Sequence, residues 1–134
     1  MNNNIYKIEG MTNGSAYLIH FWSKSCPVCH DNILKVQNIR DLYRGKGLIV
    51  IAIHRPMGPY DLDIDSVNQV RDQIGITEKC IFDNDHSIGD SLGVIAWPTY
   101  FLFDSECKLR RHAKGQLGIR MIEQSLIRMF SESS

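Results

Sequence analysis

Two cysteines separated by two residues are the part of this sequence best suited to chemistry. Cys26 and Cys29 follow residues 17–22, a run in which every residue but His20 is apolar or aromatic. Such a run is typical of a buried strand. Pro27 suits the first turn of a helix, because its φ is already helical and its missing N–H would have no partner there. We therefore expect Cys26 near a helix N-cap and Cys29 one turn later, with both sulfurs on one face.

This position predicts a reactive thiol at Cys26. Unpaired N–H groups and the positive end of the helix dipole favour a thiolate over a thiol, and Lys24 adds a positive charge nearby. Cys29 should lie deeper and serve as the resolving thiol. Together they predict a two-step exchange, in which Cys26 forms a mixed disulfide with a partner and Cys29 then releases it.

The composition is that of one globular domain spanning residues 1–134, with an N-terminal segment (1–14) and a flexible tail (131–134). Fifteen basic side chains balance fifteen acidic ones, which argues against nucleic acid or a membrane surface as a partner. No apolar run has the length of a signal peptide, so we expect a cytoplasmic protein; an exported form whose leader has been removed is the alternative. Four cysteines are too few for a disulfide scaffold and favour redox chemistry.

The periodicity of apolar residues predicts alternating strands and helices. Residues 26–43 form a predicted amphipathic helix and 48–53 a buried strand parallel to the first, because a helix joins them. A second helix ending at Gly75 should bury a stripe of four residues, namely Ile64, Val67, Val70 and Ile74. The remaining predicted elements are a strand at 80–82, a helix at 87–92, an antiparallel hairpin from 99 to 114, a helix after Gly118 and an edge strand that includes Ile5, Tyr6 and Ile8.

This order of elements, with Cys-X-X-Cys opening the first helix, resembles the thioredoxin fold, an α/β fold with a central mixed β-sheet flanked by helices. Phe21-Trp22 before the active-site turn, Trp97-Pro98-Thr99 before the hairpin and Asp104 after its first strand support the resemblance. The extra helix and strand before the proline look like the TlpA/ResA branch. The resemblance implies a thiol–disulfide oxidoreductase in which Pro98 is cis and lies against the cysteines.

The resemblance also assigns roles around the cysteine pair. His20 stands where thioredoxin has a buried acid and could take the Cys29 proton; a hydrogen-bonded core histidine is the equally weighted alternative. Ser25 replaces the tryptophan that usually precedes the first cysteine, and the intervening dipeptide is Pro-Val. The candidate substrate-binding residues are Trp97, Trp22, Pro27 and Val28, with the loop of residues 54–60 at the groove. We expect a monomer without cofactor or metal that exchanges with disulfide-containing proteins and a thiol reductant or reductase.

Several other functions use the same residues. A thioredoxin-like redox-sensing or binding module would form the bridge without efficient turnover. Cys26-Pro27-Val28-Cys29-His30 also matches the c-type haem attachment motif, which would need a mostly helical surrounding. A zinc site would need further paired ligands, and Cys80 and Cys107 are not paired with others. Peroxide reduction by Cys26 is disfavoured because no Pro-X-X-X-Thr-X-X-Cys pattern occurs.

Overall fold

The computed structural model describes residue 8 and residues 11–132, which build one five-stranded sheet of order β3-β2-β1-β4-β5. The strands are β1 (Ala16–Trp22), β2 (Leu48–His54), β3 (Lys79–Phe82), β4 (Thr99–Phe103) and β5 (Leu109–Lys114). The helices are α1 (Pro27–Tyr43), α2 (Ile64–Ile74), α3 (Ser87–Ser91) and α4 (Gly118–Glu132), with short 3-10 helices η2 (Arg44–Lys46) and η3 (Pro59–Asp61).

Strand β1 lies at the centre of the sheet, and all seven of its residues are buried. It pairs in parallel with β2, from Ala16 opposite Leu48 to Trp22 opposite His54, and antiparallel with β4. A strand buried on both faces needs apolar residues throughout, which is why this run lacks the alternation of a half-exposed strand. The predicted parallel pair and antiparallel hairpin are both confirmed.

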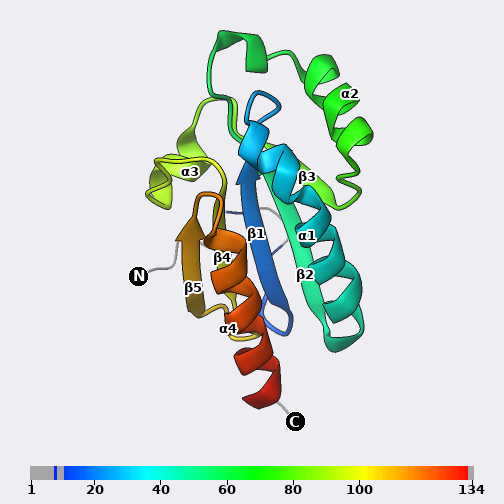
Figure 1. Cartoon of the computed structure of the whole chain (residues 1–134). Coiled ribbons are helices and arrows are strands. Elements are labelled where there is room, and N and C mark those ends of the chain that lie inside the picture. Colours follow the sequence, from blue (N-terminus) through cyan, green and yellow to red (C-terminus); the bar gives the residue numbers. More distant parts are fainter. Residues whose placement is uncertain (1–7, 9–10, 133–134) are drawn as a thin grey trace.

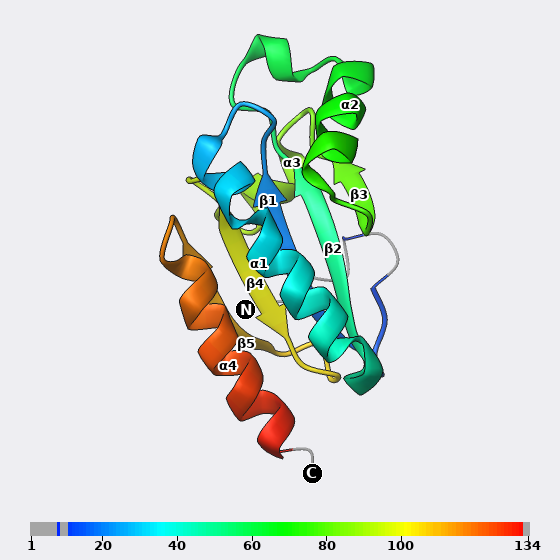
Figure 2. The same cartoon turned by 45° about the vertical axis from the view of Figure 1, so that its right-hand side comes forward.

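Helices α1 and α4 lie side by side on one face of the sheet, as both views show (Figures 1 and 2). They bury their apolar residues against the even-numbered side of β1, in a cluster that includes Leu18, Val36, Leu102, Ile122 and Leu126. A second cluster covers the opposite face with Tyr17, Ile19, Phe21, Ile53 and Phe101, against which the α3 region packs. Both faces of the sheet are therefore packed, and the candidate site lies at the end of the sheet where β1 and β2 terminate.

A third apolar cluster lies where β1 and β2 end, between α1 and α2. It contains both Cys26 and Cys29 and is completed by Trp22, Ile33, Ala52, Val67 and Ile76. The cysteine pair is thus packed within the hydrophobic core and does not lie on its surface.

The structure corrects three sequence-based predictions. Ile64 does not belong to the buried stripe of α2, because it is 45% exposed at the first position of the helix. Helix α4 continues to Glu132, so residues 131–132 are helical rather than a frayed tail. Ile8 is buried but lies in a bend, while Ile5 and Tyr6 lie outside the described residues.

Candidate active site

Cys26 and Cys29 are joined by a disulfide across the first turn of α1. Their Cα atoms are 5.3 Å apart, and the two residues are only 3% and 1% exposed. Cys26 is the N-cap, and its sulfur accepts a hydrogen bond from the Cys29 backbone N–H at 3.1 Å. Pro27 occupies the first helical position and is exposed, whereas Val28 is half-buried. The predicted geometry of the pair is confirmed, and the dipeptide between the sulfurs forms the outer rim of the site.

The turn before Cys26 is fastened to a buried carboxylate. Asp61, in η3, is 0% exposed and accepts hydrogen bonds from the hydroxyls of Ser23 (2.8 Å) and Ser25. The backbone N–H of Met57 donates a third bond at 2.8 Å. Burial alone would raise the pKa of Asp61, but these hydrogen bonds, led by that of Ser25, together hold it below its usual value. Ser25 therefore has a structural partner at the position where thioredoxins carry tryptophan.

His54, the last residue of β2, also holds the turn that precedes Cys26. Its Nε2 accepts a hydrogen bond from the Lys24 backbone N–H at 3.2 Å, and its ring meets Trp22 edge-on at 4.8 Å between centroids. Burial lowers the pKa of His54 to about 4, so the ring is neutral at pH 7. Trp22 itself is 0% exposed. Its prediction as a substrate contact is corrected here, because in this structure it offers a substrate no surface.

Trp97 and Pro98 form the side of the site that faces β4. The peptide bond between them is cis, Pro98 is buried, and half-buried Trp97 packs against the cluster that holds the cysteines. The indole Nε1 donates to the Arg55 carbonyl at 2.7 Å, and the guanidinium of Arg55 lies 5.9 Å from the ring centroid. Arg55 is itself buried and paired with Asp83 (3.3 Å) and Asp90 (2.8 Å). One arginine thus fixes the indole by both its backbone and its side chain.

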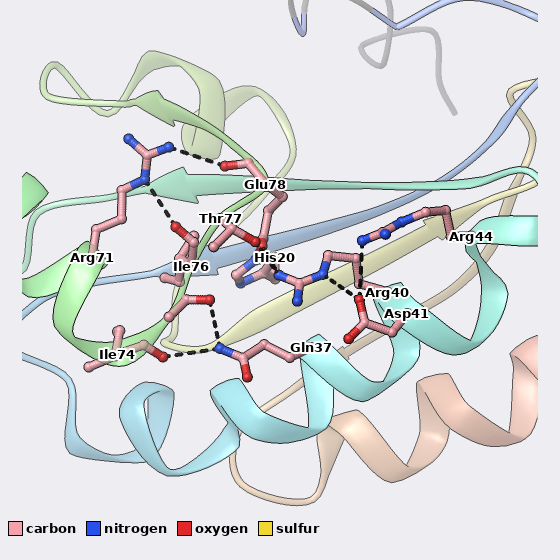
Figure 3. A network of polar contacts seen from close by, with 11 residues as sticks. His20, Gln37, Arg40, Asp41, Arg44, Arg71, Ile74, Ile76, Thr77 and Glu78 are labelled. Carbon is pink, nitrogen blue, oxygen red and sulfur yellow. Dashed lines mark hydrogen bonds and ion pairs between the residues drawn. The ribbon is translucent and has the colours of Figure 1, made fainter.

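His20 makes its hydrogen bond to a carboxylate, in a network of polar contacts that also includes Arg40 of α1 (Figure 3). Its Nε2 lies 2.6 Å from Glu78 Oε2, and Arg40 on α1 contacts the other carboxylate oxygen at 3.1 Å. Burial would raise the pKa of Glu78, but its hydrogen bonds to His20 and Arg40 together lower it to about 2. The core-histidine alternative is therefore the one with an observed partner, although the partner is a side chain rather than the backbone.

The two remaining cysteines are free thiols and half-buried. Cys80 packs against the cluster that contains the active-site pair, and burial raises the pKa of its thiol. Within residue 8 and residues 11–132, no group of three or more histidine, cysteine or acidic side chains is placed to hold a metal ion. None of the helices in this part of the chain is long and apolar enough to cross a bilayer.

Comparison with known proteins decides the family. A family model described as AhpC/TSA matches residues 2–112. The chain belongs to the AhpC/TSA family. Within it, the chain is similar to the thiol-disulfide oxidoreductase YkuV of Bacillus subtilis, with 34% identity over 116 residues that cover 87% of this chain and 78% of that protein. It is also 22% identical to ResA of Geobacillus thermodenitrificans, over 84% of this chain and 62% of the relative.

A solved structure supports the thioredoxin-like fold. The solution structure of a thioredoxin-like protein in the oxidized form superposes with a TM-score of 0.81 and 30% identity, covering 98% of this chain and 86% of that one. The predicted thioredoxin-like fold and thiol–disulfide oxidoreductase class are confirmed by these relatives and by the Cys26–Cys29 bridge. The mixed sheet around the motif also contradicts the mostly helical surrounding that haem attachment would need.

The buried Glu78 generates a prediction about stability. Its pKa is about 4.5 in an unfolded chain and about 2 here, so its contribution is complete above pH 4.5 and is lost as the pH falls towards 2. Glu78→Gln should lower the free energy of unfolding by about 3 kcal/mol at pH 7, as measured by urea denaturation. The difference from wild type should shrink below pH 4.5.

Glu106→Gln is the matched control, because this side chain is 73% exposed and pairs with exposed Lys108 at 3.6 Å. Its effect should stay within about 0.5 kcal/mol at every pH. A Glu78→Gln deficit that persists undiminished near pH 2 would contradict the assignment of an ionised, buried carboxylate.

Proposed function

We propose that Cys26 is the attacking thiol and Cys29 the resolving thiol of this oxidoreductase, acting on disulfides of protein partners. The observation that carries the proposal is the bridge at the start of α1, in which Cys26 caps the helix. In the dithiol form, the same cap position places the Cys26 sulfur at the positive end of the helix dipole, beside the backbone N–H of Cys29. Cys29 lies inside the helix, on the side of the core.

The exchange consumes no cofactor and balances as two sulfur displacements. The Cys26 thiolate attacks one sulfur of a partner disulfide; the partner's S–S bond breaks, and its second sulfur leaves with the electron pair and takes up a proton. The Cys29 thiolate then attacks the Cys26 sulfur and expels the partner's first sulfur as a thiolate. The partner gains two electrons and the protein is left as the observed disulfide, which a dithiol donor returns to the dithiol form.

The surface around the sulfurs supports a role in holding the partner. Pro27 and Val28 form the rim beside the bridge, and Trp97 is held against the cluster by Arg55. By the resemblance to thioredoxin, Pro98 lies against the sulfurs and aligns an incoming disulfide. The exposed residues of the connection after β2, Met57 and Tyr60 among them, extend this surface.

Cys26→Ser should abolish reduction of insulin disulfides, because serine cannot form the mixed disulfide. Cys29→Ser should instead trap the partner on Cys26, seen as a thiol-sensitive adduct on a non-reducing gel. Cys107→Ser, which alters a free thiol outside the pair, is the control and should retain wild-type turnover. Turnover retained in Cys26→Ser would contradict the mechanism, and a bridge that forms without turnover in wild type would indicate a redox-sensing module.

We also propose that His20 accepts the Cys29 proton through its buried network. The pair with Glu78 supports the proposal, because a buried carboxylate stabilises an imidazolium formed during exchange. His20→Gln should slow release of the mixed disulfide about 100-fold in stopped-flow kinetics. Alkylation of Cys26 by iodoacetamide, which does not involve Cys29, should keep its wild-type rate. Equal slowing of both reactions, or of neither, would leave His20 with a structural role only.

A cytoplasmic reductant is the role we propose for the protein as a whole. The free thiols at Cys80 and Cys107 support it, because thiols persist in compartments that are kept reducing. Equilibration with glutathione buffers, followed by Trp22 fluorescence, should give a reduction potential near that of thioredoxin, about −270 mV. A value near −120 mV would identify an oxidant and argue for an exported protein instead.

A further inference from the structure

A single buried carboxylate holds the turn that delivers Cys26, and the exchange steps make no use of it. Oδ2 of Asp61 accepts from the Ser23 hydroxyl and the Met57 backbone N–H, both at 2.8 Å, while Oδ1 accepts from the Ser25 hydroxyl. A charge that is fully removed from water is costly unless donors surround it. The three donors, two of them from the turn itself, explain how the carboxylate persists inside the protein.

The hydrogen bonds connect this carboxylate to Cys26 through a short path. The Cys26 backbone N–H donates to the Ser23 carbonyl at 3.1 Å, and the Ser25 N–H donates to the Ser23 hydroxyl at 3.3 Å. Ser25 precedes Cys26 directly in the chain. Asp61 therefore restrains the residues on which the N-cap position of Cys26 depends.

Asp61 also places a negative charge against Ser25, the residue directly before the cysteine that must become a thiolate. Of the charged groups facing this turn, Lys24 is half-buried and donates to the Ser66 hydroxyl at 2.9 Å, so it offsets part of the charge. His54 is buried and neutral at pH 7, and Arg55 is paired with its own carboxylates. His30, one residue beyond the pair on α1, is half-buried. In this surrounding, a buried anion disfavours a second negative charge on Cys26.

We propose that Asp61 is a positioning residue for disulfide exchange: its carboxylate fixes the turn that carries Cys26, and its charge restrains ionisation of the Cys26 thiol. The inference rests on the proposed role of Cys26 as the attacking thiol. A stabilised thiolate favours the reduced protein, so hindering ionisation of Cys26 shifts the balance towards the disulfide. The protein is then a stronger reductant than it would be if the helix N-terminus were the sole influence on Cys26.

Asp61→Asn is the decisive variant, because it removes the charge and can keep every hydrogen bond. The amide oxygen can accept from Ser23 and Met57, and the amide N–H can donate to the Ser25 hydroxyl, which also accepts. The reduced protein is alkylated with iodoacetamide over a range of pH, and the peptide containing Cys26 is quantified by mass spectrometry. We expect the titration midpoint of Cys26 to fall by roughly half to one pH unit.

Below that midpoint the rate of alkylation should rise roughly two- to fivefold, because the larger thiolate fraction is partly offset by a weaker nucleophile. Asp65→Asn is the matched control: it removes the same charge four residues away at an exposed position, and its midpoint should not move. An unchanged or raised midpoint in Asp61→Asn, or an equal fall in both variants, overturns the proposal.

Ser25→Ala gives an independent test should the asparagine variant fail to fold, since Ser25 is exposed. It removes one donor and leaves the anion buried, so less of the charge is neutralised and the midpoint should rise; a fall would overturn the proposal. Alkylation requires no partner disulfide, so these outcomes are separate from the insulin assay. A protein that fails to reduce insulin yet shows the Asp61→Asn shift would refute the proposed function, while the control of Cys26 ionisation by Asp61 would still stand.

Discussion

A carboxylate can be buried only where donors replace its water. Two such groups, Asp61 and Glu78, join the segment between β2 and β4 to the rest of the protein, and a third, Asp83, holds that segment together. Asp61 takes its donors from the turn between β1 and α1, and Glu78 takes them from β1 and α1. Asp83 accepts from Arg55 and from the backbone at the start of α3. Apolar contacts are not directional and would not fix where α2 and η3 lie on the core, whereas the hydrogen bonds to these carboxylates do.

The consequence is an active site assembled from three separate stretches of chain. The cysteine pair comes from the start of α1, the Trp97–Pro98 peptide precedes β4, and the connection after β2 touches both. His54 and Asp61 hold one side of the site, and Arg55 holds the other. Residues 54–61 therefore set the position of the Trp97 indole relative to the two sulfurs, although none of these eight residues takes part in the exchange.

Local patterns in the sequence were enough to predict the order of strands and helices and the cysteine geometry, and the resemblance to thioredoxin supplied the fold. A buried run followed by Cys-Pro-Val-Cys predicts a strand that ends at a helix N-cap, and the observed bounds of β1 and α1 agree with it. Such features depend on neighbours within about one turn of helix, which the sequence displays directly. Ile64 was misplaced because periodicity continues to the first residue of a helix, whereas burial there depends on what packs against it.

The supporting residues could not be predicted in the same way, because their partners lie far away along the chain. Asp61 stands two residues before Asp63, the N-cap of α2, yet its carboxylate bonds to a turn 36 and 38 residues earlier. Glu78 reaches across 58 residues to His20. An isolated acidic residue near the end of a strand or helix reads as a solvated side chain until the fold is known.

Arg55 also limits which residues the neighbouring helix can contain. A Cβ added at Gly89 in α3 would lie 2.3 Å from Arg55 Nη1 and 2.8 Å from its Cζ, although glycine inside a helix costs about 1 kcal/mol relative to alanine. The two positions should therefore vary together among related chains: where the arginine is kept, residue 89 stays glycine, and where it is replaced by a shorter side chain, alanine becomes acceptable. Glycine is therefore required at position 89 by the size of the Arg55 side chain and not by the backbone conformation.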